Sequence, residues 1–361
     1  MKELIQNMMR YAIELAAKAG GNTLPNPRVG AVIFNADGKI LGECYHRFYG
    51  SQHAEVAAIN DAASKGHSVK GSAMCVTLEP CNHHGKTGPC SAVIKNSGIT
   101  KVYIGVGDDC KTVCGCGTDV LLQAGIDVET NILREECLDL NLGFHKYNAT
   151  ELPFVRLKVA MSANGRMGSK KFTSEMSQKM VHKLRENSDL IITGLGTIKN
   201  DDPSMNVRFD STAHPKNVLI MDEDVELLDR YLKRDLRVFG SSNKVIIAAC
   251  DKNKLELLKS AGINVVQCER NSYGQIELTS TLRKIAVNLG FREVMVEAGP
   301  TLIRSFLELG SPYIDALDLF IAPIFLSDKE PCFILKNDVY MQAKLVGVKK
   351  LDDNVHCQWR F

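Results

Sequence analysis

His53-Ala54-Glu55 and Leu78-Glu79-Pro80-Cys81, followed by Cys90, are the stretches that decide the fold and the chemistry of the first half of this chain. Zinc takes nitrogen and sulfur ligands tetrahedrally, and a catalytic zinc site leaves its fourth position to water. His53, Cys81 and Cys90 would supply three such ligands. Glu55 would be the free carboxylate that moves protons between water and substrate. The pattern predicts a hydrolytic zinc site.

The combination of these four residues is more specific than any one of them. An imidazole followed by a nearby carboxylate, with two thiolates further on, is the signature of zinc nucleobase deaminases, in which two residues usually separate the cysteines. Here eight residues separate Cys81 from Cys90. Most of the twelve cysteines are interpreted as structural. His53 and Glu55 would lie at the start of one helix and Cys90 at the start of another, where the positive helix end favours a thiolate over a thiol.

Composition limits the kind of protein and its partners. A chain of 361 residues is long enough for two domains, each with its own core. The formal net charge of +2 gives no electrostatic reason to expect nucleic acid or an anionic membrane as a partner. No apolar stretch approaches the roughly 18 residues that cross a bilayer, and the first residues do not look like a signal peptide. Twelve scattered cysteines favour reduced thiols, so a cytoplasmic enzyme is expected.

The first half alternates between helical and strand periodicities. Helices are expected over residues 5–19 and 53–65 and from residue 90 onward, and strands over residues 29–34, 39–45, 74–78 and 101–106. A sheet covered by helices on both faces accounts for this alternation, so a three-layer α/β unit is predicted.

The pattern restarts near residues 148–153 and alternates again. Strands are expected over residues 154–160, 190–193, 218–221, 245–249, 264–267 and 293–296, and helices over residues 174–187, 252–261 and 277–289. No repeat relates the halves. Two different α/β domains, 1–147 and 148–361, are the simplest account.

Longer motifs resemble a known family. Thr23-Leu24-Pro25-Asn26-Pro27 and the segment from Val76 to Cys90, with its long insert between the cysteines, look like the N-terminal half of the bifunctional riboflavin-biosynthesis deaminase/reductase family. Residues 156–166, 194–203 and 296–302 resemble its reductase half. The resemblance implies a cytidine deaminase-like domain over residues 1–147 and a dihydrofolate reductase-like domain over residues 148–361.

The reductase motifs also have a physical reading of their own. Residues 294–302 form a buried strand, a glycine turn and a helix start, and such a helix N-terminus suits a phosphate or pyrophosphate. Many α/β loops look the same, so this alone is weak evidence. Gly194-Leu195-Gly196-Thr197 would be a second turn whose backbone can come close to a bound phosphate. Neither is the G-x-G-x-x-G fingerprint of a Rossmann domain.

Carried over position by position, the resemblance implies the residues of two sites. Asn26 would contact the base in the deaminase, beside the metal ligands and Glu55. The substrate contacts of the reductase would be Arg185, Met205, Arg208 and Glu297. Arg185 and Arg208 would act as guanidinium forks for a ribose phosphate, although Arg185 could equally be a surface charge near a helix end. The cofactor contacts would be Met161, Lys171, Thr197, Asp201, Gly299, Pro300, Thr301, Leu302, Ile303, Arg304 and Ser305.

The resemblance implies two consecutive reactions on one pyrimidine ribose phosphate. Zn²⁺ would support hydrolytic deamination of 2,5-diamino-6-(5-phosphoribosylamino)pyrimidin-4-one, with Glu55 as general base and then acid. NADPH would then reduce the ribosyl group to ribityl, with the nicotinamide carrying the chemistry. The family also implies a homo-oligomer.

Departures from the family keep three alternatives open. Asn164 stands where the family has an aspartate, and Lys171 where it has a tryptophan. A deaminase whose second domain does not reduce would fit these changes. A paralogue acting on a related pyrimidine in a secondary pathway would fit the altered segment 108–116. A non-enzymatic binding module would be expected to lose Glu55 or a zinc ligand first, and all four residues are present.

Overall fold

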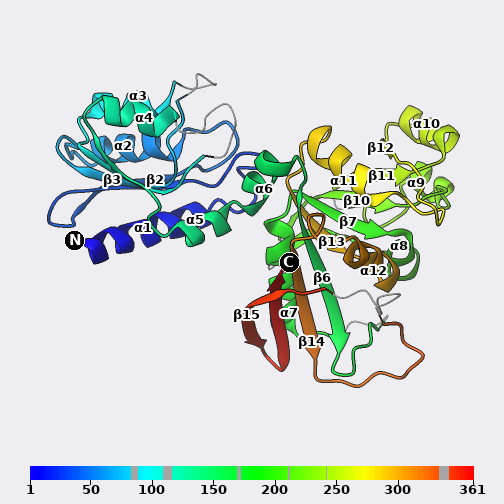
Figure 1. The fold of residues 1–361 in the computed structure, drawn as a ribbon. Helices are drawn as coiled ribbons and strands as arrows, with labels where there is room; N and C mark the ends of the chain where they lie inside the picture. The colour runs from blue at the N-terminus through cyan, green and yellow to red at the C-terminus, as the bar shows by residue number, and fades with distance from the viewer. Residues whose placement is uncertain (83–87, 109–115, 169–171, 210–211, 241, 333–340) are drawn as a thin grey trace. The chain divides into compact units, whose positions relative to one another are not determined.

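The computed structural model of the chain describes all residues except 83–87, 109–115, 169–171, 210–211, 241 and 333–340 (Figure 1). Contacts divide it into two compact units, Met1–Thr150 and Glu151–Phe361. The boundary expected after residue 147 falls inside helix α6 (Leu142–Thr150), and the structure divides the chain after Thr150 instead. Within the described part of the chain, no helix is long and apolar enough to cross a membrane.

The first unit is a five-stranded sheet between two helical layers, as Figure 1 shows. The strand order is β2-β1-β3-β4-β5; β1 runs antiparallel to both neighbours, and β3, β4 and β5 are parallel. The strands are β1 (Gly30–Phe34), β2 (Ile40–Tyr45), β3 (Ala73–Leu78), β4 (Lys101–Val106) and β5 (Asp127–Glu129). The helices are α1 (Lys2–Ala17), α2 (Ala54–Ser64), α3 (Cys90–Ser97), α4 (Cys116–Gln123), α5 (Arg134–Leu140) and α6.

Strand alternation gives each face of this sheet its own core. Successive strand residues point to opposite faces, so Val32 packs with Met9 of α1, whereas Ile33 packs with Ala58 of α2 and Ile94 of α3. The helix α2 lies very close to β2, because a Cβ added at Gly42 would sit 2.3 Å from the Ala58 carbonyl oxygen. This tight packing fixes the start of α2, which carries His53 and Glu55.

The second unit contains a nine-stranded sheet with the order β12-β11-β10-β7-β13-β6-β14-β16-β15. The strands from β12 to β14 in this order are parallel, and β16 and β15 complete the sheet antiparallel. The strands of the unit are β6 (Phe154–Ser162), β7 (Leu190–Gly194), β8 (Val207–Phe209), β9 (Thr212–His214), β10 (Asn217–Met221), β11 (Lys244–Ala249), β12 (Asn264–Gln267), β13 (Glu293–Glu297), β14 (Ala316–Ala322), β15 (Lys344–Leu351) and β16 (Asn354–Arg360). The helices are α7 (Glu175–Glu186), α8 (Leu195–Asp201), α9 (Leu228–Lys233), α10 (Lys252–Ser260), α11 (Leu278–Val287) and α12 (Pro300–Leu309).

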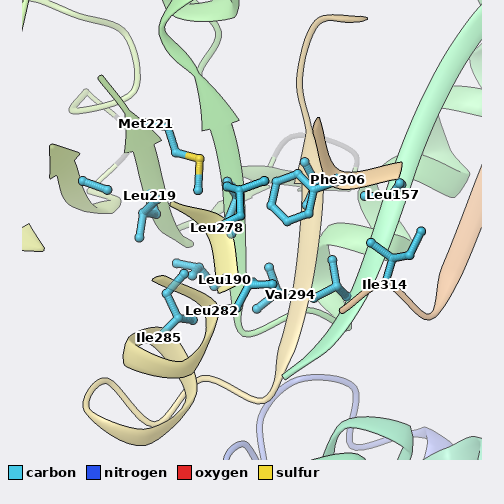
Figure 2. Close-up of a cluster of buried hydrophobic side chains, with 14 of the residues drawn as sticks. Leu157, Leu190, Leu219, Met221, Leu278, Leu282, Ile285, Val294, Phe306 and Ile314 are labelled. Carbon is cyan, nitrogen blue, oxygen red and sulfur yellow. The ribbon is translucent and has the colours of Figure 1, made fainter. Parts of the chain in front are cut away.

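Helices cover both faces of this sheet. Leu282 of α11 and Phe306 of α12 pack on Leu157, Leu190 and neighbouring strand residues, the cluster that Figure 2 shows. The opposite face carries α8, α9 and α10, whose apolar side chains form a second cluster. Because the parallel strands end on one edge, the turns after β7, β10 and β13 lie together, and ligands of open α/β sheets bind at such an edge.

Candidate active sites

The three expected zinc ligands come together in the first unit. His53 is the residue immediately before α2, Cys81 follows β3, and Cys90 is the first residue of α3. Both cysteines are buried. The Ser91 backbone N–H donates to the Cys81 carbonyl oxygen at 3.2 Å, which joins the start of α3 to the loop after β3. The ligand atoms of the three residues all lie within 4.8 Å of one another.

The spacing of these atoms fits zinc. His53 Nδ1 lies 3.5 Å from Cys81 Sγ and 3.3 Å from Cys90 Sγ. Tetrahedral zinc with bonds of about 2.05 Å to nitrogen and about 2.3 Å to sulfur requires a nitrogen–sulfur separation of about 3.6 Å. The hydrogen bond from the Cys90 thiol lowers the pKa of Cys81, and the same interaction raises the pKa of Cys90. The pair therefore already holds one thiolate near neutral pH.

Glu55 lies in the first turn of α2 and is 3% exposed. Burial raises its pKa to about 7, and the nearby Cys81 thiolate acts in the same direction. A carboxyl group with a pKa near the working pH can both accept and return a proton. This is the property that the sequence analysis expected of Glu55.

A carboxylate that the sequence analysis did not single out supports the loop of Cys81. Glu79 is buried, and its two oxygens accept hydrogen bonds from the backbone N–H groups of Asp108 (3.2 Å) and Thr118 (2.9 Å). Gly117 packs beside it, because an added Cβ would lie 1.9 Å from the Pro80 carbonyl oxygen. The signal in the sequence was Glu79 itself, a charged residue directly after a buried strand.

Asn26 and His46 lie in segments that flank the first sheet. The Asn26 backbone N–H donates to the Thr23 carbonyl oxygen at 2.8 Å, in the loop between α1 and β1. The His46 ring packs edge-on against the His53 ring with centroids 5.6 Å apart, and it is buried. His46 was not predicted from the sequence; the signal would have been a histidine at a strand end shortly before His53.

A large cavity of about 1440 Å³ opens at the strand-end edge of the second unit. Every expected substrate contact of this unit lines it, namely Arg185, Met205, Arg208 and Glu297. So do seven of the expected cofactor contacts, Thr197, Asp201, Gly299, Pro300, Thr301, Leu302 and Ser305. The fold therefore brings together residues of α7, α8, β8, β13 and α12 that are far apart in the sequence.

The remaining expected cofactor contacts are not among the described residues that line the cavity. Ile303 is fully buried in the apolar core, where its side chain contacts Phe306 and its neighbours. Met161 packs at the edge of the same core. Among the described residues, the cavity lining contains none of Met161, Ile303 and Arg304. Lys171 lies outside the described residues.

The turns after β7 and β13 are joined by a hydrogen bond. The Gly299 backbone N–H donates to Thr197 Oγ1 at 3.1 Å. Gly299 precedes α12, which has proline at its first position and no side chain capping its free N–H groups. Such a helix start is suited to a phosphate. Thr197 thus positions the expected phosphate-binding turn.

Arg185 is buried, so its surface-charge alternative is wrong. Its Nε and one terminal nitrogen donate to the two oxygens of Glu297 at 2.8 and 2.9 Å, and its other terminal nitrogen donates to the Asn206 carbonyl oxygen. Lys158 Nζ lies 3.4 Å from Glu297 Oε1 and also lines the cavity. These cations lower the pKa of Glu297 to about 2 despite the opposing effect of burial. Lys158 was not predicted from the sequence, although a lysine inside a largely buried strand was a visible signal.

The departure at Asn164 has a structural explanation. Asn164 Nδ2 donates to the Leu326 carbonyl oxygen at 2.8 Å, while its Oδ1 accepts from the Leu326 backbone N–H at 3.1 Å. An aspartate could not donate the first of these bonds. Asn164 thus fastens the segment after β14. Phe172, next to the expected aromatic position, contributes a ring to the cavity wall.

Comparisons with known proteins match both halves of the chain. Residues 2–106 match the cytidine and deoxycytidylate deaminase zinc-binding region, and residues 153–357 match the RibD C-terminal domain. The chain is 34% identical over 333 residues to the riboflavin biosynthesis protein RibD of Aquifex aeolicus, covering 91% of this chain and 89% of that protein. It is 37% identical to RibD of Bacillus amyloliquefaciens, covering 88% and 84%.

A solved structure matches the whole chain. The diaminohydroxyphosphoribosylaminopyrimidine deaminase/5-amino-6-(5-phosphoribosylamino)uracil reductase of Thermotoga maritima superposes with a TM-score of 0.87 at 29% identity, covering 99% of both chains. The fold is a cytidine deaminase-like domain followed by a RibD reductase domain. Zn²⁺ and NADPH are the cofactors consistent with these two domains. The chain belongs to the RibD family, the bifunctional deaminase and reductase enzymes of riboflavin biosynthesis.

Proposed function

We propose that His53, Cys81 and Cys90 hold Zn²⁺ and that Glu55 is the proton carrier of the deaminase. The observation that carries this proposal is the pair of nitrogen–sulfur distances, 3.3 and 3.5 Å, beside a buried carboxyl group. The substrate is the diamino pyrimidine ribose phosphate that the family resemblance implies, and Asn26 contacts its base.

The deamination replaces the exocyclic amino group of the pyrimidine by oxygen from water. Zinc, when bound, supplies a Lewis acid that lowers the pKa of a water ligand. Glu55 removes a proton from the attacking water and returns it to the departing nitrogen, so that ammonia leaves. Its pKa of about 7 allows both roles near neutral pH. The buried setting of Glu55 keeps bulk water from exchanging that proton.

The reduction adds a hydride and a proton across the ring-opened imine of the sugar. NADPH, when bound, supplies the hydride. Gly299, Pro300, Thr301, Leu302 and Ser305 bind its phosphates at the start of α12, and Thr197 and Asp201 contact it from the turn after β7. We leave Met161, Lys171, Ile303 and Arg304 as contacts proposed from the family alone.

Glu297 binds the ribose hydroxyls in this proposal. It is ionised at neutral pH, because its pKa is about 2, and it therefore accepts hydrogen bonds. Arg185 holds both oxygens of Glu297 and fixes their direction. Lys158 is a proton donor on the same wall of the cavity. Met205 and Arg208 complete the proposed substrate contacts.

We assign residues 1–150 to the deaminase and 151–361 to the reductase, and we propose that the enzyme is a cytoplasmic homo-oligomer. The edge strand β15 supports self-association, because Leu345, Val346 and Val348 are 48–58% exposed and β16 is the one strand paired with β15 among the described residues. Such edges pair readily with a second chain. Buried free thiols such as Cys75 and Cys137 support a reducing compartment.

The test uses purified, zinc-loaded enzyme and the diamino pyrimidine phosphate, with and without NADPH. Ammonia release and nicotinamide absorbance are followed separately. We expect ammonia in both reactions and NADPH oxidation where the cofactor is present. Ammonia without oxidation would leave a deaminase whose second domain does not reduce. Absence of both signals would require a different substrate.

A further inference from the structure

The large cavity of the second unit extends past the residues that the proposed reductase function uses. Its wall continues from the turn after β7 to the turn after β10, which carries Glu223, and to the segment after β12, which carries Tyr273. β10 lies beside β7, with Met221 paired to Gly194, and neighbouring strands are about 4.8 Å apart. A dinucleotide whose pyrophosphate lies at the turn after β7 and the start of α12 therefore brings its adenosine ribose to the end of β10.

Glu223 has a fixed backbone and a carboxylate that is available to a ligand. The Cys250 backbone N–H donates to the Glu223 carbonyl oxygen at 2.9 Å, which continues the pairing of β10 with β11. The preceding Asp222, by contrast, is fully buried and accepts a hydrogen bond from the Tyr231 hydroxyl of α9 at 2.9 Å. Within the described part of the chain, no group forms a hydrogen bond or an ion pair with the carboxylate of Glu223. Both of its oxygens can therefore accept hydrogen bonds from a molecule in the cavity.

An aromatic ring lies at the same part of the cavity as Glu223. Tyr273 lines the cavity and is 84% exposed. Its backbone N–H donates to Asn271 Oδ1 at 2.9 Å, which fixes the turn that carries it. Arg270, at the start of this turn, forms an ion pair with Asp224, the residue after Glu223. An exposed ring is a stacking surface for a base, so a base and the hydroxyls of its ribose have complementary groups here.

The cations of the cavity are not paired with Glu223. The basic residues of its lining, counted over the described residues, are Lys158, Arg185, Arg208 and Arg237. The first two pair with Glu297, and the Arg208 guanidinium donates to Asn206 Oδ1. None of the four forms an ion pair with Glu223 within the described part of the chain. A phosphate placed against Glu223 would meet a like charge, whereas a hydroxyl can donate to it.

We propose that Glu223 binds the 2′- and 3′-hydroxyls of the adenosine ribose while Tyr273 stacks on the adenine, and that Glu223 makes NADH a cofactor of this reductase beside NADPH. A carboxylate holds two hydroxyl donors but repels a 2′-phosphate. In doubly wound α/β folds that bind dinucleotides, an acidic side chain likewise accepts from the 2′-hydroxyl of NAD, and an arginine accommodates the 2′-phosphate of NADP. The inference rests on the proposed reductase function and specifies its cofactor.

The experiment measures the binding of two cofactor fragments, ADP-ribose and 2′-phospho-ADP-ribose, to the full-length enzyme by calorimetry. These fragments lack the nicotinamide, so their binding needs neither turnover nor the pyrimidine substrate. The variants are Glu223→Gln, Glu223→Arg and Tyr273→Ser. Glu256→Gln, which changes an exposed carboxylate of α10 outside the cavity wall, is the matched control. Reductase kinetics with NADH and with NADPH are recorded in parallel.

We expect the wild type to bind ADP-ribose at least as tightly as 2′-phospho-ADP-ribose. Glu223→Gln should weaken ADP-ribose binding by roughly tenfold, as loss of hydrogen bonds to a charged acceptor does. Glu223→Arg should also tighten 2′-phospho-ADP-ribose binding, because a guanidinium group pairs with phosphate. The ratio of kcat/KM for NADH to kcat/KM for NADPH should fall in the same order. Tyr273→Ser should weaken both fragments alike, and Glu256→Gln should match the wild type.

Three results would count against the proposal. A wild type that binds 2′-phospho-ADP-ribose more tightly than ADP-ribose would place a cation, such as Arg237, at the 2′-position. An unchanged ratio of the two affinities in both Glu223 variants would remove Glu223 from the site, and unchanged binding in Tyr273→Ser would remove the stacking contact. Failure of the reductase function itself is distinguishable, because fragment binding that depends on Glu223 without oxidation of either cofactor would leave the adenosine site standing.

Discussion

Glu55 and Glu297 show how neighbours decide the protonation of a buried carboxyl group. Burial raises the pKa of Glu55 to about 7, and the neighbouring His53 offsets this only in part. Burial also acts to raise the pKa of Glu297, yet Arg185 and Lys158 hold that pKa at about 2. A proton carrier and a fixed hydrogen-bond acceptor therefore arise from one residue type.

The replacement Glu55→Gln keeps the size of the side chain and removes its ability to carry a proton. We expect the deamination rate to fall by roughly 10²–10⁴-fold, the usual contribution of general acid–base catalysis. Zinc content, measured by metal analysis, and the reductase rate should stay at wild-type levels. Glu14→Gln, an exposed carboxylate on α1, is the matched control. A deamination rate within a few fold of wild type would remove Glu55 from the mechanism.

The metal set was predictable from sequence because each member is placed by its own local signal. His53 and Cys90 stand at helix starts, and Cys81 follows a buried strand. The pairing of Arg185 with Glu297 was not predictable, because the two residues are 112 positions apart and no local pattern joins them.

At the scale of elements, turns fix the positions of the functional residues. Gly117 of α4 lies against the loop that carries Cys81, with no room for a methyl group. A Cβ added at Gly88, two residues before Cys90, would meet no atom of the described residues within 4 Å. Substitutions at the two glycines therefore offer a matched pair of tests for the loop that carries Cys81, which we call the metal loop.

Gly117→Ala places a Cβ 1.9 Å from the Pro80 carbonyl oxygen, so the loop or the helix must shift. We expect weaker zinc binding and a loss of deaminase activity of tenfold or more, measured by chelator competition and ammonia release, with the reductase rate unchanged. Gly88→Ala should behave as wild type. Equal zinc affinity in both variants would show that the loop absorbs the clash.

The junction of β6, β14 and β16 contains a buried charge cluster. Asp318 is fully buried, pairs with Arg156, and accepts hydrogen bonds from His356 Nε2 (2.7 Å) and Gln358 Nε2 (2.9 Å). These partners hold the pKa of Asp318 at about 2 against the effect of burial. The cluster joins the parallel part of the sheet to its antiparallel end.

Asp318 should make the stability of the second unit depend on pH. A lowered folded-state pKa stabilises the fold above the unfolded pKa of about 3.9, and this contribution, roughly 2 kcal/mol, is lost as the pH falls toward 2. Asp318→Asn should cost about 3–5 kcal/mol at pH 7, because it leaves Arg156 without its counter-ion. Urea unfolding at pH 7, 4 and 3 should show the difference between variant and wild type shrinking with acid. A constant difference would contradict this account.

At the scale of the whole molecule, the sequence predicted most of the parallel strands and several helices, but it missed the parallel strands β5 and β14 and the antiparallel end formed by β16 and β15. The predicted strands are short apolar runs between turn residues, a strong local signal. The edge strand β15 has mostly exposed residues and three lysines, so its periodicity is weak. Residues 134–150 form α5 and α6 and join the first unit through α1 and β4, which only tertiary contacts decide.

Ligand binding should stabilise the two units separately, because the zinc ligands all belong to residues 1–150 and the large cavity to residues 151–361. In scanning calorimetry we expect a chelator to lower one transition, and NADPH at about 100 times its Kd to raise the other by about 5–10 °C. Cys81→Ser should abolish only the response to chelator. A single unfolding transition whose midpoint shifts with both chelator and NADPH would contradict the expectation that the two units unfold independently.

The two hydrogen bonds accepted by Glu79 have a consequence for how this protein tolerates insertions. One carboxylate accepts hydrogen bonds from the backbone N–H groups of both Asp108 and Thr118, so these two positions of the chain are tied together. Each doubling of a connection between fixed ends costs only about 0.6 kcal/mol of closure entropy. Insertions or grafted peptides placed between these two anchors should leave the metal loop intact, which makes this connection a natural point for diversification and for library design.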